Sequence, residues 1–284
     1  MATSARSDQL LVVIDPVARR TDGESVRIAK DVLSAGATTK VCLPEGPEEF
    51  ARALARRGSR RPVVVGDDRA LMRAVSLLHR QRELADCALS VVPVGAMALA
   101  RSLGVPTGAV AAARAVLDGA ERRLDLLVDD SDGVVLGALR IPPVSGREAP
   151  RGATAVSTGA GHPWLRTCQS LVRTLVARPP RTTTVTGHGP SRLRVEVDGE
   201  TVVDLDQPVD AVSVMPGGSG VAEVRVRPLS VGAEASPVLA EGRTVTVSGA
   251  DFRYRADAVV SGPVRRRTWV VREGAWGLTL PGTG

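Results

Sequence analysis

Two loops in the first half of the chain combine glycine with charged or small residues in a way that suits contact with an anion. The first is Gly66-Asp67-Asp68-Arg69, directly after a valine run, and the second begins at Gly95. A phosphate that approaches a strand–loop–helix junction needs glycine, because a Cβ atom would block the backbone N–H groups, and the N-terminus of the following helix favours the negative charge. An aspartate in such a loop can position a nucleotide or a hydrated Mg²⁺ ion.

The histidines and cysteines do not have the spacing of a metal or redox site. His162 and His188 lie among glycines and prolines with no acidic or cysteine partner at ligand spacing, and we interpret His79 as a solvated residue on a helix. The three cysteines are odd in number and far apart: Cys42, Cys87 and Cys168. We therefore predict neither a disulfide framework nor a zinc centre.

The charge of the chain leaves several anionic partners open. Its net charge is +6 and its sequence pI is about 10.1. This balance could favour anionic lipid surfaces, nucleotides or nucleic acid, or reflect a general bias towards arginine. We favour the bias, because acidic residues are interspersed. No apolar run reaches the roughly 18 residues that span a bilayer, and no signal peptide precedes the first strand-like run, so we expect a cytoplasmic protein.

The residues up to about 130 alternate between short valine-rich runs and amphipathic stretches. Such alternation is typical of a mostly parallel sheet with helices on both faces. The predicted strands are 10–14, 40–43, 62–65, 89–92 and 124–128. The predicted helices are 24–35, 47–57, 70–82, 97–103 and 110–119.

From about residue 133 the pattern changes to short β-rich runs separated by turn signals, which indicates antiparallel strands in a sandwich or barrel. The predicted strands are 134–141, 193–197, 201–205, 211–214, 221–226, 244–247, 252–254, 267–271 and 278–280. We predict an irregular linker at about 142–190. The expected domains are thus residues 1–132 and 133–284.

Three segments in the first half carry a resemblance to a known family. The first strand ends in Ile14-Asp15-Pro16, and the third leads into 63–71, Val-Val-Val-Gly-Asp-Asp-Arg-Ala-Leu. The fourth leads into Val92–Gly95 and then 100–106, Ala-Arg-Ser-Leu-Gly-Val-Pro. In this order the segments resemble the diacylglycerol kinase-like (lipid kinase) family, which has Asn-Pro, Gly-Gly-Asp-Gly-Thr, and a Gly-Thr-Gly-Asn-Asp stretch before Ala-Arg-x-Leu-Gly-Ile-Pro.

The resemblance implies both a fold and an activity. The implied fold is a Rossmann-like parallel α/β nucleotide-binding domain followed by a β-sandwich domain. The implied activity is phosphoryl transfer from ATP, with Mg²⁺, to the hydroxyl of a lipid at a membrane surface. Gly66, Asp68, Arg69 and Gly95 match positions of the family's nucleotide-binding loops, and Asp257 of Asp257-Ala258-Val259 matches its catalytic Asp-Gly-Glu. The intact Asp198-Gly199-Glu200 lies far from that position, and we interpret it as a hairpin turn because Asp-Gly is a strong hairpin signal.

The sequence departs from the family where phosphate would be bound. Asp67, Arg69 and Ala70 replace Gly, Gly and Thr, so a second negative charge stands beside the expected phosphates, while Arg69 could contact one of them. The second loop, 96–99, is one residue shorter and has lost its polar groups. Two hypotheses follow: a lipid kinase whose activity is reduced or lost, and a non-catalytic member that binds nucleotide or lipid or acts as an interaction module. Nucleic-acid binding has no stacking surface or recognised motif behind it.

Overall fold

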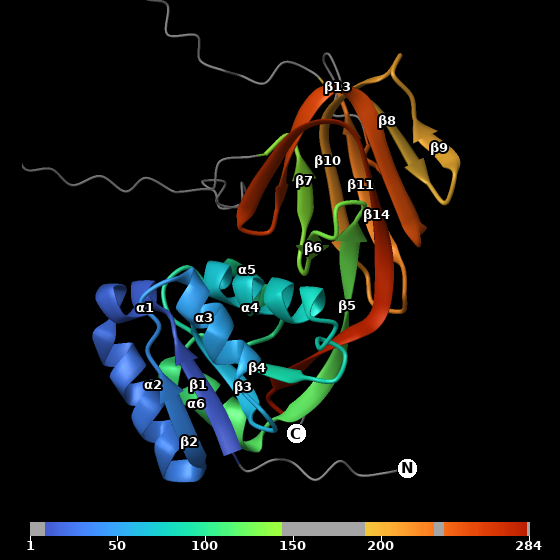
Figure 1. Cartoon of the computed structure of the whole chain (residues 1–284). Coiled ribbons are helices and arrows are strands. Elements are labelled where there is room, and N and C mark those ends of the chain that lie inside the picture. Colours follow the sequence, from blue (N-terminus) through green and yellow to red (C-terminus); the bar gives the residue numbers. More distant parts are fainter. Residues whose placement is uncertain (1–8, 144–190, 230–235, 283–284) are drawn as a thin grey trace, which may run out of the picture. The chain divides into compact units, whose positions relative to one another are not determined.

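The structure is a computed structural model that describes residues 9–143, 191–229 and 236–282 (Figure 1). The described residues on both sides of the gap at 144–190 belong to one compact unit. Most of the predicted linker at 142–190, with His162, Cys168 and His188, lies outside the described residues. In the described part of the chain, no helix is long and apolar enough to cross a bilayer.

Four strands in the first half form a parallel arrangement in the order β4-β3-β1-β2. They are β1 (Gln9–Ile14), β2 (Thr38–Cys42), β3 (Arg61–Gly66) and β4 (Ala88–Pro93). The central strands are buried over almost their whole length, as expected of valine-rich runs covered on both faces. The predicted parallel pairing of these strands is confirmed.

The helices cover the two faces of these parallel strands. They are α1 (Pro16–Thr21), α2 (Gly23–Gly36), α3 (Pro47–Ala55), α4 (Asp68–Arg80), α5 (Ala98–Ser102) and α6 (Ala109–Asp118). Buried residues of α2 and α6 pack on one face, and those of α3, α4 and α5 pack on the other. The sequence did not predict α1, which begins at Pro16 with the Asp15 side chain as its N-cap.

The strands from residue 134 onward pair with one another in antiparallel orientation, as predicted. The prediction that 124–128 belongs to the parallel sheet is wrong, because this strand joins these antiparallel strands. The antiparallel strands are β5 (Ala120–Asp129), β6 (Val134–Val135), β7 (Leu139–Ile141), β8 (Ser191–Val197), β9 (Glu200–Val203), β10 (Pro208–Pro216), β11 (Ala222–Pro228), β12 (Val238–Gly242), β13 (Thr244–Ala256) and β14 (Val259–Leu280). The predicted strand at 134–141 is interrupted at Leu136-Gly137-Ala138, and β12 was not predicted. Two pairs of predicted strands merge into the long β13 and β14.

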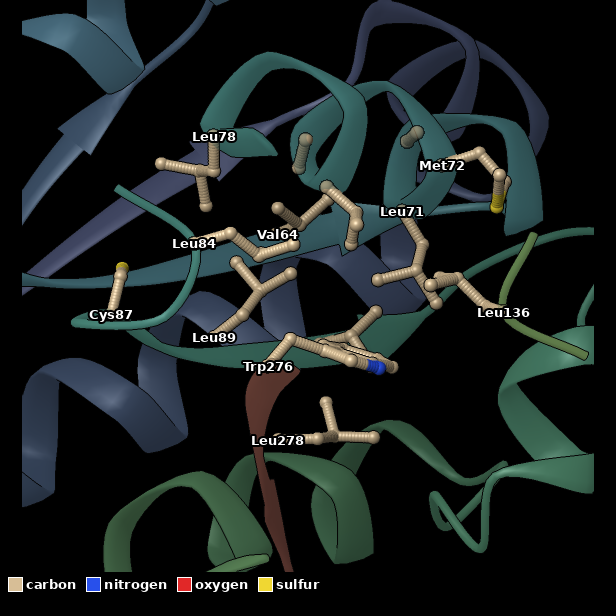
Figure 2. Close-up of a cluster of buried hydrophobic side chains, with 14 of the residues drawn as sticks. Val64, Leu71, Met72, Leu78, Leu84, Cys87, Leu89, Leu136, Trp276 and Leu278 are labelled. Carbon is tan, nitrogen blue, oxygen red and sulfur yellow. The ribbon is translucent and has the colours of Figure 1, made fainter. Parts of the chain in front are cut away.

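The last strand connects the antiparallel strands to the parallel ones. The N-terminal part of β14 pairs with β13, and its C-terminal part pairs with β5 and, in parallel, with β4. Figure 2 shows Trp276 and Leu278 of β14 among side chains such as Val64, Leu89 and Leu136, in a cluster beneath α4. The strand β14 lies after residue 133 in the sequence but contributes to the cores of both halves. The division into domains 1–132 and 133–284 stays a prediction.

Candidate functional site

The predicted phosphate-contacting loops lie at the carboxyl ends of the parallel strands. Asp15 directly follows β1, Asp67 and Asp68 follow Gly66 at the end of β3, and Gly95 follows β4. The chain leaves β1 towards one face of the sheet through α2, and leaves β3 towards the other face through α4. Ligands of open parallel sheets bind at such a switch point, outside the carboxyl ends of the strands.

The end of β1 holds a buried ion pair. The Asp15 residue is only 2% exposed. Its Oδ1 accepts a hydrogen bond from the Val17 N–H (2.8 Å), and its Oδ2 accepts one from Arg73 Nη1 (2.7 Å). The Arg73 guanidinium also lies over the Phe50 ring, 5.4 Å from its centroid. The sequence did not predict the role of Arg73. The available signal was Asp15 itself, because a carboxylate directly after a buried strand needs a cation or several N–H donors beside it.

The N-terminus of α4, where the family places a phosphate, is occupied by groups of the chain itself. The Asp67 carboxylate accepts the Ala70 N–H (3.0 Å), and the Asp68 N–H donates to the Ala96 carbonyl (2.9 Å). Arg69 is exposed on the first turn. Because α4 is capped by Asp67, the N–H groups of Asp68 and Ala70 already have acceptors and are not open to an external anion.

The Asp68 side chain joins the two predicted loops. It is 7% exposed, and its Oδ2 and Oδ1 accept the N–H groups of Leu99 (2.9 Å) and Ala100 (3.0 Å) at the start of α5. A carboxylate suits this position because the first N–H groups of a helix lack partners within it. In this structure Asp68 holds α5 against the end of β3.

The two glycines that match the family's loops, Gly66 and Gly95, are required by the scaffold itself. A Cβ atom at Gly66 would lie 2.7 Å from the Ala70 Cβ and 3.0 Å from the Asp15 Cβ. Gly95 has a φ of +98°, which favours glycine. Both glycines are therefore explained without a bound phosphate, and Asp67 and Arg69 stand where the family motif has its other two glycines.

Asp257 lies in the turn between β13 and β14 with a φ of +49°. Its Oδ2 accepts the Leu136 N–H (2.7 Å), and its Oδ1 accepts those of Gly137 and Ala138 (both 2.8 Å). The residues that carry these N–H groups, 136–138, interrupt the strand predicted at 134–141, because the groups bind Asp257. Burial raises the pKa of Asp257; the three N–H donors act in the opposite direction, and the negative charge of Asp68 adds to the rise.

The structure links Asp68 to Asp257 through Leu99 and Gly137. Asp68 accepts the Leu99 N–H, and a Cβ placed on Gly137 would lie 2.7 Å from the Leu99 side chain and 3.0 Å from Asp257 Oδ1. The negative charge of Asp68 accordingly contributes to the raised pKa of Asp257. Gly95 lies beside the other aspartate of the loop, with 3.5 Å from its added Cβ to the Asp67 Cβ. The nucleotide-binding role of Gly66, Asp68, Arg69 and Gly95 and the catalytic role of Asp257 stay predictions.

Other candidate residues lie outside this region. Asp198 and Gly199 form the turn between β8 and β9, with φ values of +50° and +88°, which confirms the predicted hairpin. The prediction for His79 is wrong, because its side chain is only 15% exposed and its Nε2 lies 2.9 Å from Asp132 Oδ1. Burial raises the pKa of the Cys87 thiol. Among the described residues, no group of three or more His, Cys, Asp or Glu side chains could hold a metal ion.

A cavity of about 320 Å³ lies between β2 and α3 and includes none of the predicted site residues. Its lining comprises Leu11, Lys40, Cys42, Leu43, Pro44, Glu49, Arg52, Ala53 and Arg56. Since Asp68 and Asp257 do not contribute to it, the cavity is separate from the candidate site.

The Asp15–Arg73 pair gives a stability prediction. Replacing Arg73 by methionine leaves the buried Asp15 carboxylate without its cation, and we expect the free energy of unfolding to fall by about 2 kcal/mol, less than for a fully buried pair because Arg73 is partly exposed. In the double variant Asp15→Asn/Arg73→Met most of this loss should return, since asparagine carries no charge and can still accept the Val17 N–H. Urea unfolding of the unaltered chain, Arg73→Met, Asp15→Asn and the double variant measures the coupling; losses that add would show that the pair contributes nothing.

Known proteins match the first half of the chain in sequence and nearly the whole chain in fold. Residues 9–128 match the diacylglycerol kinase catalytic domain. A solved structure of a diacylglycerol kinase from Bacillus anthracis str. Sterne has a TM-score of 0.66 and 11% identity, covering 96% of this chain and 97% of that one. A candidate diacylglycerol kinase from the same organism has a TM-score of 0.67 and 12% identity, covering 97% and 98%. No curated protein shows significant sequence similarity.

At such low identity the solved structures show a shared fold over nearly the whole of both chains. The sequence match to the catalytic domain includes β1, β3, β4 and both loops at their carboxyl ends. Residues 9–128 are therefore a domain of the diacylglycerol kinase catalytic type.

Proposed function

We propose that this chain is a lipid-binding member of the family that does not transfer phosphate. The observation that carries the loss of phosphate transfer is the occupation of the helix N-termini by the chain's own carboxylates, while lipid binding follows from the family resemblance. Asp67 accepts an N–H group of α4, and Asp68 accepts two N–H groups of α5. Anions bind at helix N-termini through such N–H groups, so a nucleotide phosphate would compete with groups that are covalently held in place.

The charges of the site also disfavour the binding of a nucleotide. A triphosphate at the end of β3 would meet Asp67 and Asp68 together, and like charges repel strongly where solvent is partly excluded. Arg73 could offset this charge, but it is already paired with the buried Asp15. Each Asp68 oxygen accepts one N–H group of α5, so this carboxylate is already committed to holding the helix in place. The residues present therefore do not fit ATP and Mg²⁺ in the way the family's motif does.

Lipid kinase activity is the second candidate, and one observation favours it. Asp257 has a raised pKa, to which the charge of Asp68 contributes, and two interacting carboxylates are typical of sites where one acts as a base. Its Oδ2 accepts a single N–H group and keeps a second acceptor position. Asp257 would then accept the proton of a lipid hydroxyl, as the resemblance implies.

Measurements of nucleotide binding and of phosphoryl transfer distinguish the non-catalytic lipid-binding protein from the lipid kinase. We expect no heat of ATP–Mg²⁺ binding in calorimetry and no transfer of radiolabelled γ-phosphate to diacylglycerol or a mixed lipid extract. The variant Asp67→Gly/Arg69→Gly/Ala70→Thr has the family sequence in the first loop and frees the α4 N-terminus. We expect this variant to bind ATP measurably, because the competing carboxylate is removed.

The matched control is Asp86→Gly, which removes an exposed aspartate outside the site and should leave nucleotide binding undetectable. Transfer of phosphate by the unaltered chain, lost on Asp68→Ala while the protein stays folded, would overturn the proposal and establish the kinase. If the triple variant folds and still does not bind ATP, occupation by Asp67 is not what prevents binding.

A further inference from the structure

The solvent-facing side of the antiparallel strands carries a line of arginines that the candidate site does not use. The strand register places Arg225 of β11 opposite Ser213 of β10, Ser213 opposite Arg140 of β7, and Arg140 opposite Arg255 of β13. Directly opposite residues project from the same face of a sheet. Arg225, Ser213, Arg140 and Arg255 therefore form one row across four neighbouring strands, about 14 Å long at the usual strand spacing. We refer to it as the arginine row.

The burial of neighbouring residues shows which face carries the row. Val224 and Val226 on either side of Arg225 are buried, and so are Leu139 and Ile141 on either side of Arg140. Since successive side chains of a strand point to opposite faces, the row points away from that core. Arg225 and Arg140 are exposed accordingly.

Among the residues that the structure describes, the arginines of the row have no acidic partner. Within residues 9–143, 191–229 and 236–282, Arg140, Arg225 and Arg255 form no ion pair, and Arg255 Nε is buried without an acceptor. Two acidic side chains of this face, Glu223 and Glu241, lie two residues further along their strands, opposite each other. Like charges that face each other, such as Arg140 and Arg255, destabilise a sheet. A bound anion would relieve that repulsion.

The two ends of the row are exposed apolar residues. The same register continues from Arg225 to Leu239 of β12 and from Arg255 to Val260 of β14, which are 65% and 46% exposed. A cationic centre with apolar ends complements an anionic membrane, where arginines meet lipid phosphates and apolar side chains enter the headgroup region. Nucleic acid fits less well, because the aromatic residues of the described chain that could stack on bases are buried: Phe50, Phe252, Tyr254, Trp269 and Trp276.

The arginine row also lies next to the candidate site. Arg255 is two residues before Asp257 on the same chain segment, and Arg140 is two residues after Ala138, whose N–H binds Asp257. We propose that the arginine row docks the protein on an anionic phospholipid bilayer, beside the loop that holds Asp257. The inference rests on the proposed lipid binding and names the surface that places the protein on the membrane.

Sedimentation with vesicles tests the docking surface. We expect the chain to bind phosphatidylcholine vesicles that contain phosphatidylglycerol, and the bound fraction to fall as salt is added. Each arginine at an anionic surface is worth about a fivefold change in partition. The variant Arg140→Gln/Arg225→Gln, at two exposed positions, should therefore bind these vesicles about 25-fold more weakly. The variant Leu239→Ser/Val260→Ser should also bind more weakly, with its salt dependence retained.

The matched control is Arg80→Gln/Arg114→Gln, which removes the same charge from exposed positions on α4 and α6 and should bind like the unaltered chain. Three results would each overturn the docking surface. The two double arginine variants could bind equally well, or the chain could bind equally to vesicles with and without phosphatidylglycerol. The third is binding to DNA but not to vesicles. Neutral vesicles that contain diacylglycerol test the proposed lipid binding separately. The Arg140→Gln/Arg225→Gln variant should bind these as the unaltered chain does, and failure of both proteins would overturn the proposed function alone.

Discussion

Replacing Asp257 by alanine should lower the free energy of unfolding by about 3–5 kcal/mol. The substitution removes the acceptor of three backbone N–H groups, those of Leu136, Gly137 and Ala138. Each N–H group left without a partner in a partly buried place costs about 1 kcal/mol or more, and alanine is also strained at the φ of +49°. Urea unfolding followed by circular dichroism measures the loss.

The variant Asp257→Asn separates this structural role from a catalytic one. Asparagine tolerates a positive φ and keeps one acceptor oxygen, but its amide group would face one of the three N–H donors. We therefore expect a smaller loss, about 1–2 kcal/mol. If the alanine variant is as stable as the unaltered chain, Asp257 does not hold the 136–138 loop, and any loss of activity on its removal would then point to the base.

The raised pKa of Asp257 adds a pH dependence. A carboxyl group that binds its proton more tightly in the folded state makes the folded state relatively more stable at low pH, and this contribution is lost as the pH rises through the raised pKa. The stability of the unaltered chain relative to Asp257→Asn should therefore be greater near pH 4 than near pH 7. Unfolding of both proteins at the two pH values tests this sign, because the carboxyl groups that do not interact with Asp257 titrate alike in both proteins.

The parallel half of the fold could be predicted because its signals are local. The buried strands β1 and β3 contain uninterrupted runs of valine, leucine and isoleucine at 10–14 and 63–65, and α2 and α4 have apolar residues at helical spacing. The long strand β13 was predicted as two, because Gly249-Ala250-Asp251 resembles a turn in the sequence. In the structure it lies at a shift in register between β13 and β14, which bends the strand without ending it.

The candidate site could be predicted only where a motif marked it. Asp68 and Asp257 were found through the resemblance, and the structure brings their charges together. Their partners were not found: Arg73 reaches Asp15 from 58 residues away, and Asp257 binds N–H groups about 120 residues earlier in the chain. Such contacts depend on how strands and helices pack, which local periodicity does not encode. The arginine row could not be predicted for the same reason, because only the register of the strands aligns Arg225, Arg140 and Arg255.

Replacing Trp276 by alanine should lower the free energy of unfolding by about 4 kcal/mol. Trp276 is fully buried beneath α4, in the cluster that Figure 2 shows with Leu71, Leu89 and Leu136. It belongs to β14, which also pairs with β13, so a cavity at this position weakens the contact of the last strand with the first half of the chain. Because the described residues form one compact unit, we expect a single unfolding transition at a lower urea concentration.

The variant Trp276→Phe distinguishes the loss of packing from the loss of a hydrogen bond. The indole N–H is buried and has no acceptor among the described residues, so its removal should cost nothing in hydrogen bonding. Phenylalanine fills most of the space, and we expect a loss of about 1 kcal/mol, that of a partly filled cavity. A loss as large as that of the alanine variant would mean that the N–H group has a partner in solution. Two separate transitions in either variant would instead show that the halves joined by β14 unfold independently. One core could unfold before the other only if β14 couples the two cores weakly.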